Sequence, residues 1–396
     1  MMKQKILFVL PGFTFGGTVF STLNMISLLD KEKYDIDVLA MTHQGPVKEY
    51  YENAGINILP ESIVLSALMG RLSKEHSLVR KISFYGVKVL RRLCLYAGVD
   101  FPLFVYQHKA NKIQSEKHYD YVASCQELDS TYFASCFPDT KRIAWFRSEY
   151  SVYKNQHTKA ELERERKLYH RFDQIVCVSQ TTRNDFAAHF IDIQDKIVAI
   201  HNIQNTENIE MKASASIEDS FDKNTFNIVS VGRFAPQKRF PFIPGIAAEL
   251  KKRGLNFMWH IIGDGNVAGE WDKTQENIKK YDVKDCVECM GSRLNPYPYI
   301  ASADLSVTPS YYEACPRVVI EAKILKTPCV CADFSSAREF VTSDVDGYVN
   351  TIDTIVNHIA DMISNKELYN RIKTECNKYQ IDNQVIYSKL QKVFSK

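Results

Sequence analysis

The chain has few of the features that mark specialised classes of protein. Ten cysteines among 396 residues are too few for a disulfide framework, which is a device of small secreted domains. No run of about 18 to 20 apolar residues is present, so we expect no membrane-spanning helix. The formal net charge is only +3, which indicates neither a dedicated nucleic-acid binder nor an acidic tail.

Sequence motifs of metal and dinucleotide enzymes are also missing. The ten histidines show no H-E-x-x-H spacing, and Gly12, Gly16 and Gly17 do not form G-x-G-x-x-G. Cys286 and Cys289 have the spacing of a metal knuckle, but no second pair follows at a suitable distance. We therefore interpret these two cysteines as core thiols.

The N-terminal sequence MMKQKILFVLPGF has a charged start followed by a short apolar run, Ile6 to Leu10. No small-residue cleavage site follows this run, so we interpret the segment as a strand rather than a signal peptide. With neither a leader nor a spanning helix expected, the sequence predicts a cytoplasmic protein with reduced thiols.

What the sequence does contain is a regular alternation of short β-rich runs and helical patterns. Such alternation is typical of βαβ units around parallel sheets. A chain of 396 residues exceeds what one hydrophobic core usually supports, so we expect two domains of the α/β class. The polar stretch 206–224 separates two series of strands, and we interpret it as a linker. The predicted strands are 6–11, 34–40, 56–60, 119–125, 142–146, 174–179 and 196–202, and then 227–232, 258–263, 286–291, 304–310 and 328–334.

Residues 71–117 depart from this alternation because they are strongly basic. They include ten Lys or Arg residues and three acids, a net charge of +7. The part LVRKISFYGVKVLRRLCLY, residues 78–96, can form an amphipathic helix with a basic face. It is either a surface helix with a solvated charged side or a helix on an anionic membrane, where each base contributes about 1 kcal/mol. No nucleic-acid motif accompanies the charge, so a nucleic-acid partner is not expected.

Two acids, Glu313 and Glu321, flank Pro316 in the sequence PSYYEACPRVVIEA. Proline disfavours helical geometry in the residue before it and suits the first turn of a helix, so we expect a helix to begin near Pro316. Glu313 then lies in the loop before that helix, and Glu321 lies in its second turn. The preceding strand ends here, which places both acids at the carboxyl edge of a parallel sheet, where ligands bind.

The start of the same helix is a candidate anion site, because backbone N–H groups and the helix dipole favour negative charge there. An acid beside such a site is suited to accept hydrogen bonds from sugar hydroxyls. Alone, these residues could equally form a surface loop followed by a half-exposed helix. The N–H groups concerned belong to Cys315, Arg317 and Val318.

Two further strand ends carry suitable chemistry. In VSVGRFAPQKRF, Gly232 ends a strand and is followed by Arg233 and Lys238, two cations that can bind a diphosphate without a metal ion. A solvated basic loop is the alternative. In IIGDGN, a Gly-Asp-Gly turn allows a backbone to approach a ligand closely.

Five segments, taken in order, resemble the C-terminal domain of the GT-B glycosyltransferases of family 4. They are VGRFAPQKRF, IIGDGN, PSYYEACPRVVIEA, TPCVCADFSSAREFV and DGYV. The spacing of Glu313 and Glu321 matches the E-x7-E motif of that family. Four other segments resemble the N-terminal domain of the same family: Gly16-Gly17, IAWFRSEYSVY, DQIVCVSQTTRNDF and IHNIQN. The resemblance covers nearly the whole chain except about residues 60–115 and the polar connector.

The resemblance implies a GT-B fold, in which two Rossmann-like parallel-sheet domains face a central cleft. Residues 1–204 would bind the acceptor and include the basic segment 71–117 as a membrane-facing part. Residues 205–380 would bind the nucleotide-sugar. Residues 381–396 would cross back as a helix onto the first domain.

The resemblance also implies roles for single residues. Glu313 would contact the donor sugar, and Arg233 and Lys238 would stabilise the departing diphosphate, so these three are the expected catalytic residues. Arg147 replaces a histidine that is frequent in related sequences and would face the donor or acceptor phosphate. Glu321 would contact the nucleotide ribose, and the other expected donor contacts are Gly16, Gly17, Arg293, Cys315, Arg317 and Val318.

The activity implied is that of a retaining hexosyltransferase, metal-independent and without a cofactor. It would move a sugar from a nucleotide-diphosphate donor, such as a UDP-sugar, to a glycan or a polyprenyl-diphosphate-linked saccharide. Such enzymes build capsule, O-antigen or exopolysaccharide, and the protein would associate peripherally with anionic lipid at the inner face of the cell membrane. The rival interpretations are a UDP-sugar epimerase of the same fold and a non-catalytic scaffold that binds a nucleotide-sugar.

Overall fold

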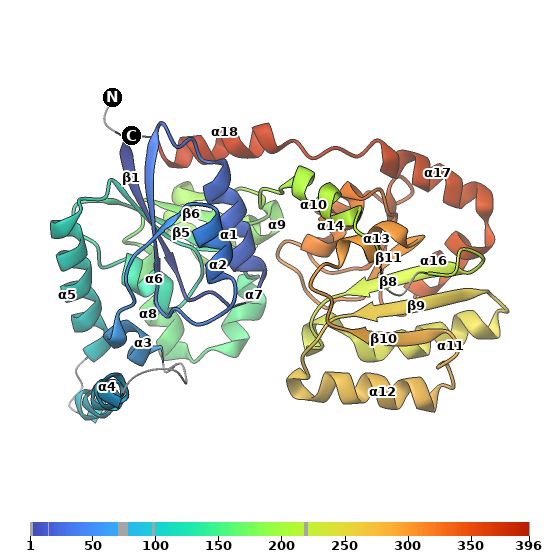
Figure 1. Ribbon diagram of the computed structural model, residues 1–396, viewed down its shortest axis with the longest axis horizontal. Helices are drawn as coiled ribbons and strands as arrows, with labels where there is room; N and C mark the ends of the chain where they lie inside the picture. The colour runs from blue at the N-terminus through green and yellow to red at the C-terminus, as the bar shows by residue number, and fades with distance from the viewer. Residues whose placement is uncertain (1–2, 15, 70–77, 97–99, 218–220, 396) are drawn as a thin grey trace. The chain divides into compact units, whose positions relative to one another are not determined.

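The computed structural model describes residues 3–14, 16–69, 78–96, 100–217 and 221–395 (Figure 1). The chain divides into two compact units. Unit 1 consists of residues 1–204 with 383–396, and unit 2 consists of residues 205–382. Each unit contains one parallel sheet, so the predicted α/β class with two parallel-sheet domains is confirmed.

Unit 1 has a seven-stranded sheet in the order β3-β2-β1-β4-β5-β6-β7, with every pairing parallel. The strand order reverses between β1 and β4, and ligands of such sheets bind at the carboxyl ends beside this reversal. The strands are β1 (Gln4–Leu10), β2 (Tyr34–Ala40), β3 (Asn57–Ile58), β4 (Tyr121–Ser124), β5 (Lys141–Phe146), β6 (Gln174–Cys177) and β7 (Ile197–Ala199).

Helices cover both faces of this sheet because successive strand residues point to opposite sides. Leu7 and Val9 belong to a core cluster that includes Tyr106 of a covering helix, whereas Phe8 faces the other side. The helices of unit 1 are α1 (Gly17–Leu28), α2 (Lys48–Asn53), α3 (Ile63–Leu68), α4 (Leu78–Tyr96), α5 (Phe101–Glu116), α6 (Asp129–Ala134), α7 (Tyr150–Tyr153), α8 (Lys159–Tyr169), α9 (Gln180–His189) and α18 (Asn383–Val393), with short 3-10 turns η1 (Lys154–Gln156) and η2 (Ile191–Lys196).

The end of the chain packs against the sheet of unit 1. Phe394, directly after α18, contacts the rings of Phe8, Tyr121 and Trp145 at centroid distances of 5.9, 5.6 and 6.1 Å. The side chain of Asn383 at the start of α18 donates to the carbonyl of Gln204 at 2.7 Å. Apolar burial therefore holds this C-terminal segment in unit 1.

Unit 2 has a six-stranded parallel sheet in the order β10-β9-β8-β11-β12-β13. Ile228 belongs to the core layer under α11 and α12, and the next residue, Val229, belongs to the layer under α13 and α14 (Figure 1). Cys329 and Cys331 share one layer, as the strand period of two requires.

The strands of unit 2 are β8 (Phe226–Val231), β9 (Phe257–Ile262), β10 (Val287–Gly291), β11 (Leu305–Thr308), β12 (Cys329–Ala332) and β13 (Gly347–Asn350). Its helices are α10 (Thr206–Ala213), α11 (Ile243–Lys252), α12 (Glu270–Lys280), α13 (Tyr297–Ser302), α14 (Arg317–Ile324), α15 (Ala337–Phe340), α16 (Ile355–Ser364) and α17 (Lys366–Asn377), with 3-10 turns η3 (Pro236–Lys238), η4 (Phe240–Phe242) and η5 (Val267–Gly269).

The prediction of a linker over 206–224 is wrong in its first part, which forms helix α10. The Asn205 side chain caps this helix by accepting from the backbone N–H of Asn208 at 3.0 Å. Ile209 is buried in the core of unit 2. The cap, the buried side chain and a hydrogen bond from Asn295 Nδ2 to the carbonyl of Lys212 at 2.7 Å help to order a polar stretch that lacks a clear apolar period.

The predicted amphipathic helix over 78–96 is confirmed as α4. The basic residues Arg71 and Lys74 of the same segment lie outside the described residues. The segment also contains a second helix, α5, which is capped by Asp100 through the N–H of Leu103. In the part of the chain that the structure describes, all ten cysteines are free thiols.

Candidate active site

Two glycines allow the loops after β8 and β9 to touch. The N–H of Gly232 donates to the carbonyl of Ile262 at 2.9 Å. A Cβ atom on Gly263 would lie only 1.7 Å from the carbonyl oxygen of Gly232, which no real contact allows. The close approach therefore requires glycine at 263, and it fixes the starting point of the loop that carries Arg233 and Lys238.

The loop after β8 is tied directly to the loop after β11. The N–H of Tyr311 donates to the carbonyl of Gln237 at 2.7 Å, and the Gln237 side chain donates to the carbonyl of Tyr312 at 2.8 Å. Arg239 adopts a left-handed conformation with φ of 54°, and its guanidinium lies 4.4 Å from the centre of the Tyr311 ring. These contacts bring the segment of Lys238 next to that of Glu313.

Lys238 and Glu313 form an ion pair in which Nζ lies 2.5 Å from Oε1. The hydroxyl of Ser310 donates to the same carboxylate oxygen at 2.9 Å. The hydroxyl of Ser336, which follows β12, donates to the backbone carbonyl of Glu313 at 2.5 Å. Glu313 thus lies where the loops after three neighbouring strands, β8, β11 and β12, meet, and a carboxylate and an ammonium are held together there.

Arg233 directly follows Gly232, and its side chain is exposed. It lies on the same loop as Lys238, but within the described residues no hydrogen bond or ion pair joins it to Glu313. The structure therefore brings together two of the three expected catalytic residues and leaves the third at the solvent-facing side of that loop.

Helix α14 begins at Arg317, directly after Pro316, as the proline predicts. Glu321 is buried in the second turn and accepts from Arg317 Nη2 at 2.8 Å and from the Tyr297 hydroxyl at 3.4 Å. Burial alone would lower the pKa of Arg317, but the Glu321 carboxylate and the Tyr297 hydroxyl together raise that pKa. The arginine therefore stays charged and holds Glu321 in place.

The remaining donor candidates near this helix, Cys315 and Val318, lie at its start and are half-buried. Arg293 lies elsewhere, in the loop after β10. It donates to the carbonyl of Met290 at 2.6 Å and to the Tyr299 hydroxyl at 3.2 Å. These contacts fix Arg293 against α13, and none of them joins it to the Lys238–Glu313 pair.

In unit 1, Arg147 directly follows β5 and connects several segments. Its Nη1 donates to Ser21 Oγ and to Asn202 Oδ1, both at 2.8 Å, and its Nε donates to the carbonyl of Cys125 at 2.7 Å. The guanidinium therefore joins the first turns of α1 to the residues after β4 and β7. Arg147 lies at the carboxyl edge of the sheet, with much of its hydrogen-bonding capacity used inside the unit.

Gly16 and Gly17 form the start of α1, and both are exposed. No heavy atom lies within 4 Å of the position that a Cβ on Gly16 would take, so the backbone here borders open space. Arg147 holds the same helix from within through Ser21, so the glycine turn and the arginine belong to one edge of unit 1.

Two buried acids near Arg147 were missed in the sequence. Glu127 accepts from the backbone N–H of Arg147, and Glu165 accepts from the hydroxyls of Tyr153 and Tyr169 at 2.8 and 3.3 Å. Burial raises the pKa of Glu127, and it raises the pKa of Glu165 to about 7. An acid just after a predicted strand, as in CQELD, was the signal available for Glu127, whereas Glu165 lies in a charged helix that gives no sign of burial.

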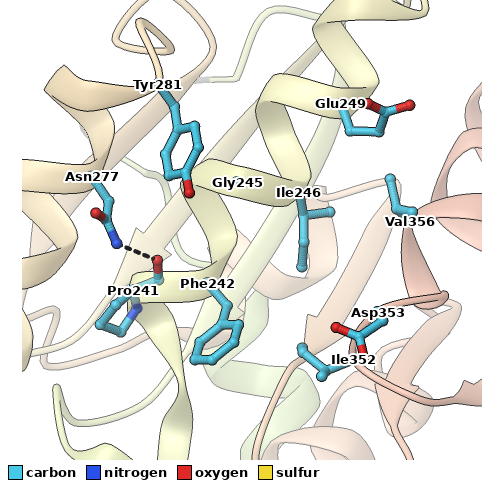
Figure 2. Close-up of a pocket in the computed structure, with 10 residues that line it drawn as sticks. All are labelled: Pro241, Phe242, Gly245, Ile246, Glu249, Asn277, Tyr281, Ile352, Asp353 and Val356. Atoms are coloured by element: carbon cyan, nitrogen blue, oxygen red, sulfur yellow. Dashed lines mark hydrogen bonds between the residues drawn. The ribbon is translucent and has the colours of Figure 1, made fainter.

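A separate hollow in unit 2 is not a site for a diphosphate. It is formed by α11, α12 and the segment before α16 (Figure 2). Its charged side chains are Glu249 and Asp353, and no Lys or Arg lines it, so a diphosphate would be repelled. The hollow is lined by Pro241, Phe242, Gly245, Ile246, Glu249, Asn277, Tyr281, Ile352, Asp353 and Val356.

Two curated glycosyltransferases resemble parts of the chain. An uncharacterized glycosyltransferase of Methanocaldococcus jannaschii is 24% identical over 214 residues, which are 52% of this chain and 52% of that protein. A Campylobacter jejuni enzyme, N-acetylgalactosamine-N,N'-diacetylbacillosaminyl-diphospho-undecaprenol 4-alpha-N-acetylgalactosaminyltransferase, is 29% identical over 187 residues, 47% of this chain and 48% of that protein. The chain thus spans about half the length of these curated relatives.

Solved structures match over almost the full length. HepE of Anabaena in complex with UDP has a TM-score of 0.73 at 15% identity, covering 99% of both chains. A glycosyltransferase of Rickettsia africae has a TM-score of 0.70 at 16% identity, covering 99% of this chain and 98% of that one. At such identities the likeness shows the fold, which is that of GT-B glycosyltransferases.

Family models cover both units. Residues 15–208 match the model described as Glycosyltransferase Family 4. Residues 212–379 match the model described as Glycosyl transferases group 1. Together with the two parallel-sheet units, these matches show that the chain belongs to the family 4 glycosyltransferases of GT-B fold.

Proposed function

We propose that the protein is a retaining glycosyltransferase that moves a sugar from a UDP-sugar to a saccharide carried on a polyprenyl diphosphate, in the synthesis of a bacterial surface polysaccharide. The observation that carries this proposal is the Lys238–Glu313 pair at the carboxyl ends of β8 and β11. The complex of HepE with UDP supports the choice of nucleotide. The name of the Campylobacter jejuni relative, which specifies a diphospho-undecaprenol acceptor, supports the choice of acceptor.

In this proposal the ammonium of Lys238 stabilises the negative charge that grows on the leaving diphosphate, with Arg233 as the second cation. A cation held in place before the reaction stabilises the transition state more than the ground state. Both contacts to the Glu313 carboxylate use Oε1, and we assign Oε2 to the hydroxyls of the donor sugar. Glu321, oriented by Arg317, is assigned to the ribose hydroxyls.

Retention follows if the acceptor hydroxyl attacks the face from which the diphosphate leaves. The C–O bond to the diphosphate then breaks as the new glycosidic bond forms, and a departing phosphate oxygen takes the acceptor proton. We assign the acceptor to unit 1, where Arg147 holds the exposed turn at Gly16 and Gly17 through Ser21. The role assigned to Arg147 is to position that turn and to add positive charge near a phosphate.

We also propose that the reaction needs no metal ion, because Lys238 and Arg233 supply the positive charge. Two Asp-x-Asp sequences occur, at 35–37 and 344–346. Asp37 accepts from Lys117 at 2.7 Å, and Asp346 lies 2.6 Å from Lys323 Nζ, so one acid of each sequence is already paired. Within the described residues there is no group of three His, Cys, Asp or Glu side chains that could hold a metal ion.

The proposed membrane contact is helix α4, which turns an apolar stripe away from unit 1. Ile82, Tyr85, Val89 and Leu93 recur at helical spacing and are 59–64% exposed. On the opposite side Phe84 is 3% exposed. No helix in the described part of the chain is long and apolar enough to cross a membrane.

Bases border this stripe. Lys88 and Arg92 are exposed and Lys81 is half-buried, whereas Arg91 donates to the carbonyl of Leu68 at 2.9 Å. An exposed apolar stripe bordered by Lys and Arg suits a helix that lies in the interface of an anionic bilayer. We therefore propose that α4 holds unit 1 at the inner face of the cell membrane, where a polyprenyl-linked acceptor is found.

One experiment separates this function from its rivals. The full-length protein is incubated with a panel of UDP-sugars, with and without farnesyl-diphosphate-linked N-acetylglucosamine, in buffer that contains EDTA. Transfer predicts a longer saccharide and free UDP; an epimerase gives a new UDP-sugar or free sugar without an acceptor; a scaffold binds but releases nothing. Loss of transfer in EDTA that Mg²⁺ restores would overturn the metal-independent mechanism alone.

A further inference from the structure

Leu128 has a strained backbone at the carboxyl edge of the sheet in unit 1. Its φ of 67° and ψ of −128° lie in a region that a residue with a side chain rarely adopts. The residue lies between the end of β4 and the start of α6, and its side chain is 48% exposed. Strained residues of this kind cluster at functional sites, where the surrounding structure holds them.

Buried polar groups hold Leu128 in this conformation. Its carbonyl accepts from the N–H of Tyr132 at 2.8 Å, and its own N–H faces the carboxyl of Glu165, where it partly opposes the rise in pKa that burial causes. Glu165 is 7% exposed and is fixed in turn by the hydroxyls of Tyr153 and Tyr169. Leu128 therefore lies between the start of α6 and the buried acid of α8.

The same loop surrounds Arg147. The carbonyl of Cys125 accepts from Arg147 Nε at 2.7 Å, and Glu127 accepts from the backbone N–H of Arg147. Arg147 also bonds Ser21 in α1, next to the point where the strand order reverses between β1 and β4. Leu128 therefore exposes an apolar side chain at the edge where a sheet of this type binds its ligand.

Packing inside unit 1 recovers part of the strain. A conformation of this kind changes the folding equilibrium by about 5- to 150-fold, and burying half of a leucine side chain recovers about 4- to 12-fold. Glycine at this position would keep the backbone and remove most of the strain. A ligand that covers the exposed half of Leu128 accounts for a leucine here.

We propose that Leu128 is a contact residue for the acceptor, packing against the apolar C–H face of its sugar, and that Glu165 is the residue that positions it. This inference rests on the proposed function, because it requires unit 1 to bind the acceptor. Sugar rings present such C–H faces between their hydroxyls, and the positive charge of the adjacent Arg147 attracts the diphosphate of the same ligand.

The test uses the full-length protein and farnesyl-diphosphate-linked N-acetylglucosamine as the probe, with binding measured by titration calorimetry. Leu128→Ala and Leu128→Gly should each weaken probe binding by about fivefold, since both remove the apolar contact. Leu128→Met should bind like the wild type because it restores an apolar side chain. Glu165→Ala should weaken probe binding without changing UDP binding.

Stability distinguishes a contact from a merely structural role. Leu128→Gly should raise the thermal midpoint of unfolding because it relieves the strain. It should also weaken probe binding because it removes the apolar contact. The inference is overturned if the wild type does not bind the probe, or if both small variants bind it as the wild type does. Whether sugar is transferred to the bound probe tests the proposed function separately.

Discussion

Lys238 and Glu313 form an ion pair across two neighbouring strand ends, with Nζ 2.5 Å from Oε1. Their side chains are only 21% and 11% exposed. Removing one member of so sheltered a pair leaves the other charge without its partner, and this costs more than the pair itself contributes. The two residues are therefore expected to act as one unit in catalysis.

The first prediction tests that coupling. Lys238→Ala and Glu313→Gln should each lower turnover by about 10²-fold, by analogy with the loss of one preorganised group. Because the residues are in contact, the double variant should lose far less than the product of the two effects. Turnover is followed as UDP release in the presence of acceptor.

Lys279→Ala is the matched control, because Lys279 is exposed in the last turn of α12. It should keep wild-type turnover. Strict multiplication of the two single effects would show that the ion pair has no bearing on the reaction.

The second prediction concerns the division of labour between the two acids. Glu321→Gln should weaken UDP affinity by about tenfold or more, since a hydrogen bond to a charged group contributes about 1.5–3 kcal/mol. Glu313→Gln should lower turnover and leave UDP affinity within about threefold of the wild type. Titration calorimetry with UDP and steady-state kinetics measure the two effects.

The Glu321 variant also leaves Arg317 without its partner, so its thermal midpoint must be measured beside its affinity. If Glu313→Gln abolished UDP binding while Glu321→Gln did not alter it, the two assignments would have to be exchanged.

The third prediction concerns the contact between the loops after β8 and β9. Gly263→Ala should destabilise the protein by about 2 kcal/mol or more, because the new Cβ would meet the carbonyl oxygen of Gly232 and the backbone must move. Turnover should fall as well, since the loop after β8, which begins at Gly232, carries Lys238. Urea unfolding and kinetics of the purified variant measure both effects.

Gly86→Ala is a control that should change the stability in the opposite direction. Gly86 lies in helix α4, and no atom lies within 4 Å of the position that its Cβ would take. Alanine in a helix is more favourable than glycine by about 0.5–1 kcal/mol, so this variant should be slightly more stable than the wild type. Equal stability of the two alanine variants would contradict the account of Gly263.

The fourth prediction is a pH dependence of stability. Burial raises the pKa of Glu165 from 4.5 to about 7, so the folded chain keeps this proton at pH values where the unfolded chain has released it. The unfolded state then binds fewer protons between pH 4.5 and 7, and the free energy of unfolding falls as pH rises through that window. The loss is about 3 kcal/mol.

Glu165→Gln should flatten this dependence, because the amide resembles the protonated acid at every pH. Urea unfolding at about pH 4 and about pH 8, on either side of that window, provides the measurement. Glu163→Gln, on the exposed side of the same helix, should keep the wild-type slope. A wild-type slope in the Glu165 variant would show that another group causes the dependence.

The sequence predicted the parts of the fold that depend on local pattern. Short β-rich runs such as 6–11 and 227–232 identify strands, and the alternating faces of Ile228 and Val229 follow from the strand period. Pro316 predicted the start of α14 because its restriction is also local. Helix α10 was missed because its order comes from a cap, one buried isoleucine and a contact with the distant Asn295.

Contacts between distant segments could not be predicted in the same way. Glu165 lies in a charged helix, so the sequence does not show that it is buried beside Tyr153 and Tyr169. The family resemblance, by contrast, named Lys238 and Glu313 together although 75 positions separate them. Their catalytic roles stay predictions.

The outward direction of the apolar stripe on α4 was also beyond the sequence. An amphipathic pattern defines two faces but not which one packs, and here Phe84 is buried while Tyr85 is exposed. The expectation from pattern alone would bury the apolar face against the unit.

The last prediction tests the membrane contact. The protein should sediment with anionic vesicles at low salt and be released at high salt, because exposed charges are screened over about 8 Å at physiological ionic strength. Changing Lys81, Lys88 and Arg92 to Ser should weaken binding at low salt, since each base near the surface contributes about 1 kcal/mol. Changing Tyr85 and Leu93 to Ser should weaken it at every salt concentration, because insertion of apolar side chains does not depend on charge. Ile191→Ser, which removes an apolar side chain 68% exposed in unit 1 outside α4, is the control and should bind vesicles as the wild type does. Equal binding to neutral and anionic vesicles, or an equal loss in the Ile191 control, would refute α4 as the membrane contact.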